Sequence, residues 1–196
     1  MTLMKSARAL AVAVLLLGSF TGTAAYADDA KPAAAAAATA AGDPTQSPAI
    51  ELAGTTAPDL ARGKRLFQTV ANCARCHGWP GDGLTGKDPR SPGIPANLRQ
   101  SSLDTDTMIQ VVSCGIPGSP MPYHDDLAYK DSRCFGTTAK DYTADQLPQP
   151  GKALNNQDII NVVAYVQQTL QGKGAVTKAE CEAYFKPGAA ACADYK

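Results

Sequence analysis

One short stretch of the sequence combines residue types and a spacing that indicate a specific chemistry. Cys73-Ala74-Arg75-Cys76-His77 is a C-x-x-C-H motif. Within one helical turn, this spacing brings two thiols to the two vinyl groups of haem, where each can form a thioether bond. The histidine that follows then lies below the iron as its proximal ligand. The motif therefore predicts one covalently bound haem c, attached through Cys73 and Cys76 and ligated by His77.

Redox-active dithiols and zinc sites also use the C-x-x-C spacing. A redox-active dithiol is expected beside a βαβ pattern, and the sequence has no strand signal of any length. A zinc site of this type needs a second pair of Cys or His ligands, but His124 is the only histidine besides His77. Haem attachment is therefore favoured over both alternatives.

The second iron ligand has to come from another part of the chain. Beyond residue 27 the sequence contains two methionines, Met108 and Met121. Met108 lies in an apolar helical stripe and is interpreted as a core residue. Met121 lies in the loop 115–122, where three prolines restrict the backbone and can hold a thioether rigidly over a metal. We therefore favour Met121 as the second ligand.

Two alternatives to Met121 remain open. His124 follows three residues later, and a pair of histidine ligands would lower the reduction potential relative to His/Met ligation. We favour instead an interpretation of His124 as a surface residue beside Asp125 and Asp126. In the other alternative the sixth position of the iron is open, and the protein is a haem enzyme or a gas sensor.

Helices before and after the motif have to position these ligands. Residues 59–70 place Leu60, Gly63, Phe67 and Val70 at three- and four-residue steps and lead directly to Cys73. Further helices are predicted over 104–113, from Asn155 or Asn156 to 170, and from Thr177-Lys178-Ala179-Glu180, a capping box, to Phe185. Residues 78–98 and 115–122 are Gly/Pro-rich loops, and 123–151 form an irregular insertion.

The order of these features resembles that of class I c-type cytochromes over residues 58–172. The resemblance implies an all-α, cytochrome c-like fold with long loops around one haem c. It implies that Gly63 and Phe67 pack the first helix against the last near Tyr165. It also implies that a proline carbonyl, that of Pro95, accepts a hydrogen bond from the other ring nitrogen of His77, which would orient the ring and raise its basicity.

The N-terminus has the pattern of a secretory signal peptide. Lys5 and Arg8 precede an apolar run from Ala9 to Phe20, and Ala25-Tyr26-Ala27 provides a small-x-small cleavage site. Residues 1–27 are therefore predicted to be removed, although an uncleaved membrane anchor is the alternative. Residues 28–57, which are rich in Ala and Pro, are predicted to form a disordered linker before the haem domain of residues 58–172 and a C-terminal tail of residues 173–196.

The chain has six cysteines, and export places them in an oxidising compartment. The four outside the motif allow three pairings. We favour Cys114–Cys134, which would close the loop carrying Met121, and Cys181–Cys192, which would staple the tail. Each closes a short loop, and in the chain-entropy picture this contributes about 3 kcal/mol of stability.

The composition bears on the expected partners. Cleavage after residue 27 leaves 16 basic and 18 acidic residues, a net charge of −2. No clustered basic surface indicates nucleic-acid binding. Three cations after the motif, Lys87, Arg90 and Arg99, either surround an exposed haem edge or are solvated loop charges, and the sequence leaves both interpretations open.

The linker, the insertion and the Cys-bearing tail resemble decorations of cytochromes that serve periplasmic dehydrogenases, including quinoprotein alcohol dehydrogenases. We therefore expect a periplasmic one-electron carrier rather than an enzyme. Its donor would be a periplasmic dehydrogenase, its acceptor a terminal oxidase or another cytochrome, and membrane contact would occur only through an uncleaved signal. A tethered haem subunit of a dehydrogenase or oxidase complex is the alternative, since a mobile arm would let a haem domain move between partners.

Overall fold

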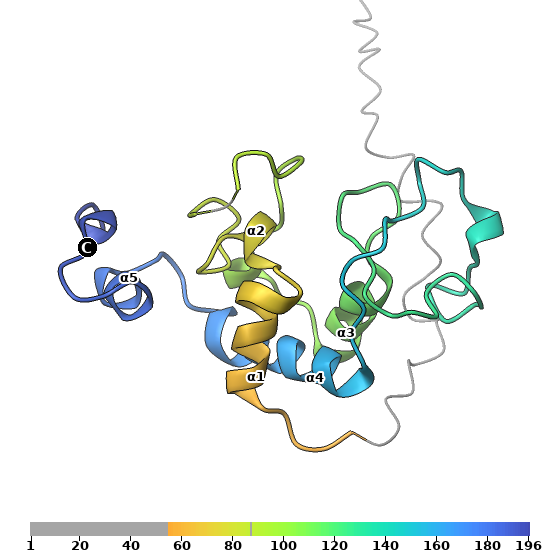
Figure 1. Ribbon diagram of the computed structural model, residues 1–196, viewed down its shortest axis with the longest axis horizontal. Helices are drawn as coiled ribbons and strands as arrows, with labels where there is room; N and C mark the ends of the chain where they lie inside the picture. Colours follow the sequence, from red (N-terminus) through yellow and green to blue (C-terminus); the bar gives the residue numbers. More distant parts are fainter. Residues whose placement is uncertain (1–54, 87) are drawn as a thin grey trace, which may run out of the picture. The chain divides into compact units, whose positions relative to one another are not determined.

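A computed structural model describes residues 55–86 and 88–196 (Figure 1). The predicted signal peptide, all but the last three residues of the predicted linker, and Lys87 lie outside the described residues. Among the residues that are described, no helix has both the length and the apolar character needed to cross a membrane.

The described part of the chain is helical, as predicted. Its α-helices are α1 (Leu60–Arg65), α2 (Ala74–His77), α3 (Thr105–Cys114), α4 (Asn156–Tyr165) and α5 (Lys178–Tyr184). Two of them continue into a wider π-helical turn: α1 into η1 (Leu66–Val70) and α4 into η4 (Val166–Leu170). Short 3-10 turns occur at η2 (Leu98–Gln100), η3 (Ala139–Asp141) and η5 (Ala190–Cys192). Within residues 55–86 and 88–196 there is no strand, only two isolated bridges.

Polar side chains fix where the longer helices begin. Asp59, Asp104, Asn155 and Thr177 each accept a hydrogen bond from the backbone N–H three residues later. These contacts satisfy N–H groups that have no partner inside the helix. Glu180 completes the predicted capping box by accepting from the backbone N–H of Thr177. The predicted helix starts are therefore confirmed to within one residue.

The first and the last helix of the haem domain pack closely against each other. A Cβ added to Gly63 of α1 would lie 2.1 Å from the carbonyl oxygen of Asn161 in α4, so only glycine fits there. The rings of Phe67 and Tyr165 pack at 5.6 Å between centroids. Arg62 adds a two-pronged ion pair with Asp158. The packing of Gly63 and Phe67 near Tyr165, implied by the family resemblance, is confirmed.

Side chains from η1, α3, α4 and η4, together with Leu154 just before α4, form the main core. Its buried members are Leu66, Phe67, Met108, Ile109, Leu154, Ile159, Val162, Val163, Tyr165, Val166 and Leu170. Burial of these apolar groups is the main force that holds the helices together. Met108 belongs to this core, as predicted, and of the two methionines in the described part of the chain only Met121 lies outside it.

Two smaller apolar clusters lie outside the main core. The insertion has its own cluster, formed by Cys114, Ala128, Tyr129 and Cys134 with neighbouring aromatic side chains. The tail contributes Cys181 and Cys192 to a third cluster, which also contains Trp79 from the loop after the motif. Each cluster is centred on a disulfide, as expected for short segments that bury little apolar surface of their own.

Candidate functional site

The C-x-x-C-H motif forms a single turn of helix directly after η1. Asn72 adopts a left-handed conformation, with φ of 57°, and turns the chain between η1 and α2. The N–H groups of Cys76 and His77 both donate to the carbonyl oxygen of Cys73, at 3.1 and 2.9 Å. This turn brings both cysteines and the histidine together, as the spacing predicts.

The state of the two motif cysteines disfavours a redox-active dithiol. Cys73 and Cys76 are unpaired and half-buried. Burial raises the pKa of the Cys73 thiol to about 12, whereas reactive dithiols need a lowered pKa to form the thiolate. Among the described residues, no group of three or more His, Cys, Asp or Glu side chains could hold a metal ion, so a zinc site also lacks its ligands.

His77 is held in one orientation with one ring nitrogen free. Its side chain is buried, and its Nδ1 lies 2.9 Å from the carbonyl oxygen of Ala96. Burial lowers the pKa of His77 despite this hydrogen bond. The ring is therefore neutral, with Nδ1–H donating to Ala96 and the Nε2 lone pair available to a metal.

The predicted acceptor, Pro95, is wrong by one residue. The carbonyl oxygen of Pro95 lies close to Gly83 instead. A Cβ added to Gly83 would be only 2.8 Å from that oxygen. The next carbonyl along the chain, that of Ala96, points to His77. The predicted kind of contact is present, but the backbone direction within this loop decides which residue provides it.

Backbone hydrogen bonds tie the loop after the motif to His77. Gly78 has φ of 76°, and a Cβ on it would lie 2.4 Å from the carbonyl oxygen of Thr85, so both conformation and space require glycine. Gly83 N–H donates to the carbonyl of His77 at 2.8 Å, and Leu98 N–H donates to that of Gly81 at 2.7 Å. The ring of His77 and its acceptor are thus fixed relative to each other.

Met121 lies in a separate loop that is held on both sides. Its carbonyl accepts from Ile116 N–H at 3.3 Å, and its own N–H donates to the hydroxyl of Ser119 at 3.2 Å. Gly118 and Tyr123 donate from their N–H groups to carbonyls of the later segment 146–149. The loop is therefore fastened to the insertion, which limits the positions that the Met121 thioether can reach.

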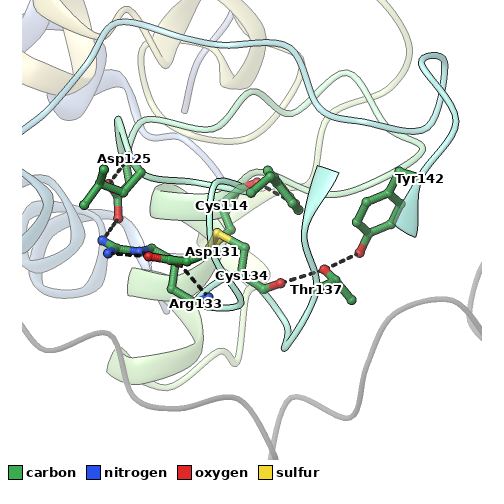
Figure 2. Close-up of a disulfide and its surroundings, with 9 residues drawn as sticks. Cys114, Asp125, Asp131, Arg133, Cys134, Thr137 and Tyr142 are labelled. Carbon is green, nitrogen blue, oxygen red and sulfur yellow. Dashed lines mark hydrogen bonds and ion pairs between the residues drawn. A yellow bond between two sulfur atoms is a disulfide. The ribbon is translucent and has the colours of Figure 1, made fainter. Parts of the chain in front are cut away.

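The disulfide Cys114–Cys134 joins the end of α3 to the insertion, as predicted, with 5.5 Å between the Cα atoms. Figure 2 shows the groups around it. Arg133 binds Asp131 and Asp125 at 2.9 and 3.1 Å, and the hydroxyl of Thr137 links the carbonyl of Cys134 to the hydroxyl of Tyr142. The other predicted disulfide, Cys181–Cys192, is also present.

The interpretation of His124 as a surface residue is wrong. Its side chain is 4% exposed, and its Nδ1 lies 2.7 Å from the carbonyl oxygen of Lys152. Its backbone N–H and that of Asp125 both donate to the carbonyl of Ser113, at 3.0 Å. The insertion folds back over the ring, which a sequence pattern with adjacent acidic residues does not reveal. His124 therefore fastens the insertion to the end of α3.

The burial of His124 makes stability depend on pH. Burial lowers its pKa below the ordinary value of 6.5, so the unfolded chain binds a proton there at a higher pH than the folded chain does. Stability is then lost as pH falls below 6.5, by at most about 1.4 kcal/mol per pH unit, and levels off below the folded-state pKa. We expect unfolding in guanidinium at pH 7.5 and 5.5 to show a smaller pH effect for His124→Gln than for the unchanged chain.

The difference between the pH effects on His124→Gln and on the unchanged chain reports on His124 alone, because His77 and every carboxylate are present in both proteins. The side chain of Gln can still donate to the carbonyl of Lys152, so the hydrogen bond is retained in kind. Equal pH effects in the two proteins would contradict a neutral, buried His124.

The structure excludes one of the three cations that were candidates to surround the haem edge. Arg99 is 3% exposed and binds the tail, so it is not a surface cation. Arg90 is exposed, but it forms an ion pair with Asp88 at 3.2 Å, and Arg75 lies 3.4 Å from the same carboxylate. These arginines hold the pKa of Asp88 at about 2, mainly through hydrogen bonds from Arg90. Lys87 lies outside the described residues.

Sequence reasoning missed three contributors to the site. Ala96 provides the carbonyl for His77, Trp79 packs against the tail, and Arg99 binds Glu180. An alanine carbonyl leaves no sequence signal. Trp79 is the single tryptophan of the chain and stands two residues after His77. Such a large apolar ring in a Gly/Pro-rich loop is the one sequence signal that another segment of the chain covers this loop.

The donor set and its surroundings fit a haem. His77 offers Nε2, the two free thiols stand one turn apart, and Met121 offers a thioether from a braced loop. Large apolar side chains are exposed in the loop after the motif and in the Met121 loop: Leu84 is 69% exposed, Ile94 92% and Ile116 43%. Exposed apolar groups beside convergent polar ones are typical of a ligand-binding surface, and a flat apolar macrocycle would bury them.

Comparison with known proteins supports the same conclusion. The family model described as cytochrome c matches residues 60–170, which is more than half of the chain. No curated protein matches the chain. The matched range begins at the first residue of α1 and ends at the last residue of η4, so it includes the motif, both loops and the insertion. The chain therefore belongs to the cytochrome c family, which binds haem c covalently and transfers electrons through its iron.

Proposed function

We propose that this protein is a monohaem electron carrier whose iron is ligated by His77 and Met121. One haem is proposed because the chain has one C-x-x-C-H motif and its four other cysteines form disulfides. The observation that carries the proposal is the buried, neutral His77 with Nδ1 bound to Ala96 and Nε2 free. A ligand prepared in this way suits reversible one-electron chemistry, in which the coordination should not change.

The proposed roles of the residues follow from their positions. Haem c, when bound, supplies an iron that alternates between the ferrous and ferric states. Cys73 and Cys76 would attach the haem, and His77 and Met121 would ligate its iron. Ala96 orients His77, and the insertion fastened by Cys114–Cys134 restrains Met121. If protein side chains supply both of these iron ligands, small molecules would have no place to bind, so we propose a carrier and not an enzyme.

We further propose that the protein works in the periplasm. The signal-peptide pattern of residues 1–27 and the two disulfides support export to an oxidising compartment. The proposed donor is a periplasmic dehydrogenase, for which a quinoprotein is one candidate, and the proposed acceptor is a terminal oxidase or another cytochrome. The absence of a clustered basic face in the sequence argues against nucleic acid as a partner.

A matched pair of methionine variants tests the ligation. We expect the oxidised holoprotein to show the weak far-red sulfur-to-iron band, and Met121→Leu to abolish it while leaving the haem covalently attached. Leu nearly preserves the volume of Met but offers no sulfur. The control is Met108→Leu, at a buried core position, which should retain the band.

Other outcomes would reject the proposal in distinct ways. A low-spin spectrum without the band in the unchanged protein would point to His124 as ligand, and His124→Gln would then alter it. A high-spin spectrum would reject the carrier role and favour ligand binding or peroxidase chemistry.

A further inference from the structure

The tail of residues 173–196 is bound to the haem domain through one buried cation. The guanidinium of Arg99 lies 3.0 Å from the carboxylate of Glu180 in α5. It also donates to four backbone carbonyls, at 2.6 to 3.3 Å; these belong to Pro80, Lys173, Gly174 and Ala175. One side chain thus joins the loop after the motif, the start of the tail and helix α5.

Aromatic packing forms a second contact between the tail and this loop. The ring of Trp79 stacks on that of Tyr184 at 4.5 Å and meets Phe185 edge-on at 5.9 Å. Trp79 also lies in one apolar cluster with Cys181 and Cys192, so the tail disulfide is part of the same contact. The stapled tail therefore covers the segment that directly follows His77.

These contacts lie on both sides of the hydrogen bond that orients His77. Trp79 and Pro80 come two and three residues after His77, and Arg99 comes three residues after Ala96. Between the two segments, Leu98 N–H donates to Gly81, and the Arg99 guanidinium donates to Pro80. The tail therefore contacts both segments of the loop, the one that follows His77, which donates this hydrogen bond, and the one that follows Ala96, which accepts it.

We propose that the tail is a clamp that sets the reduction potential of the haem, with Arg99 and Glu180 as positioning residues for the His77–Ala96 hydrogen bond. The inference rests on the proposed ligation of iron by His77. The hydrogen bond from Nδ1–H makes the imidazole a stronger electron donor and so favours ferric iron. Release of the clamp lengthens this bond, weakens the donation and raises the potential.

The first test is a redox titration of the holoprotein with Glu180→Ala. We expect the equilibrium constant for reduction to increase at least threefold, which is about 28 mV for a one-electron couple at 59 mV per tenfold. The matched control is Thr177→Ala, because it removes the other half of the α5 capping box and leaves Arg99 and Glu180 paired. The control should change the constant by less than 1.5-fold.

A second variant, with Cys181 and Cys192 both replaced by Ser, releases the tail without touching Arg99. It should increase the equilibrium constant for reduction, as Glu180→Ala does. In both variants the ring N–H of His77 should exchange with solvent at least tenfold faster in proton NMR of the ferrous protein. A tail that only adds stability would change neither the potential nor this exchange rate.

The outcomes separate this inference from the proposed function. Suppose that both variants retain the sulfur-to-iron band and lose protection of the tail from protease, yet keep the potential of the unchanged protein. The clamp would then be rejected while His77/Met121 ligation stands. A spectrum of the unchanged protein without histidine ligation would reject both.

Discussion

Gly63→Ala is expected to destabilise the folded protein by about 3 kcal/mol, although alanine is the better helix former. Propensity alone would favour Ala over Gly by about 1 kcal/mol in a helix interior. At this position, however, the new Cβ would lie 2.1 Å from the carbonyl oxygen of Asn161 and 2.7 Å from the Cβ of Tyr165. Both atoms belong to rigid parts of α4, so the two helices have to separate.

Guanidinium unfolding of the holoprotein, followed by far-UV circular dichroism, measures this change. The matched control is Lys64→Ala, an exposed substitution at the next residue of α1 that should change stability by no more than about 0.5 kcal/mol. Equal stabilities of Gly63→Ala and the unchanged protein would mean that α1 and α4 do not approach each other as closely as described.

Replacing Cys114 and Cys134 together by Ser should lower stability and also disturb the iron ligand. The bridge joins residues 20 apart, and in the chain-entropy picture its loss costs about 3.3 kcal/mol. The end of α3 and the insertion would then be joined by hydrogen bonds only, among them that from the hydroxyl of Tyr129 to the carbonyl of Cys114 at 2.9 Å. The Met121 loop lies between these elements, so we expect the sulfur-to-iron band to weaken or disappear.

The tail disulfide provides the control for this second effect. Cys181 and Cys192 are 11 residues apart, and the loss of their bridge should cost a similar amount, about 2.8 kcal/mol. That double variant should nevertheless keep the band, because the tail contacts the loop after the motif and not the Met121 loop. Loss of the band in both double variants would mean that general destabilisation, and not the bracing of Met121, removes the ligand.

The sequence predicted those parts of the structure that depend on local chemistry. The C-x-x-C-H turn, the polar caps and the apolar spacing of Phe67 each follow from residue type and interval, and all were found as predicted. The choice of Cys114–Cys134 was favoured because it closes a short loop, and it also holds. The family resemblance added the approach of Gly63 to the last helix, which periodicity alone does not indicate.

The wrong predictions share a physical cause. In each case the path of a loop determines which groups meet, and residue type and spacing do not show that path. Pro95 and Ala96 carry equivalent carbonyls, and only the turns of the Gly-rich loop determine which of the two faces His77. His124 is covered by backbone from Lys152, 28 residues later. Arg99 is neutralised by Glu180, 81 residues later. Burial of a polar side chain by distant backbone leaves no trace in its own sequence neighbourhood.

The contact between α1 and α4 also determines the order in which the chain can fold. Arg62 of α1 and Asp158 of α4 are 96 residues apart, so this contact closes a loop that contains nearly the whole haem domain. Contacts this distant in sequence form late, because the intervening chain must first be closed into a loop. Until that loop is closed, the ring of Phe67 lacks its contact with the ring of Tyr165. The topology therefore predicts that docking of α1 on α4 is a late step of folding.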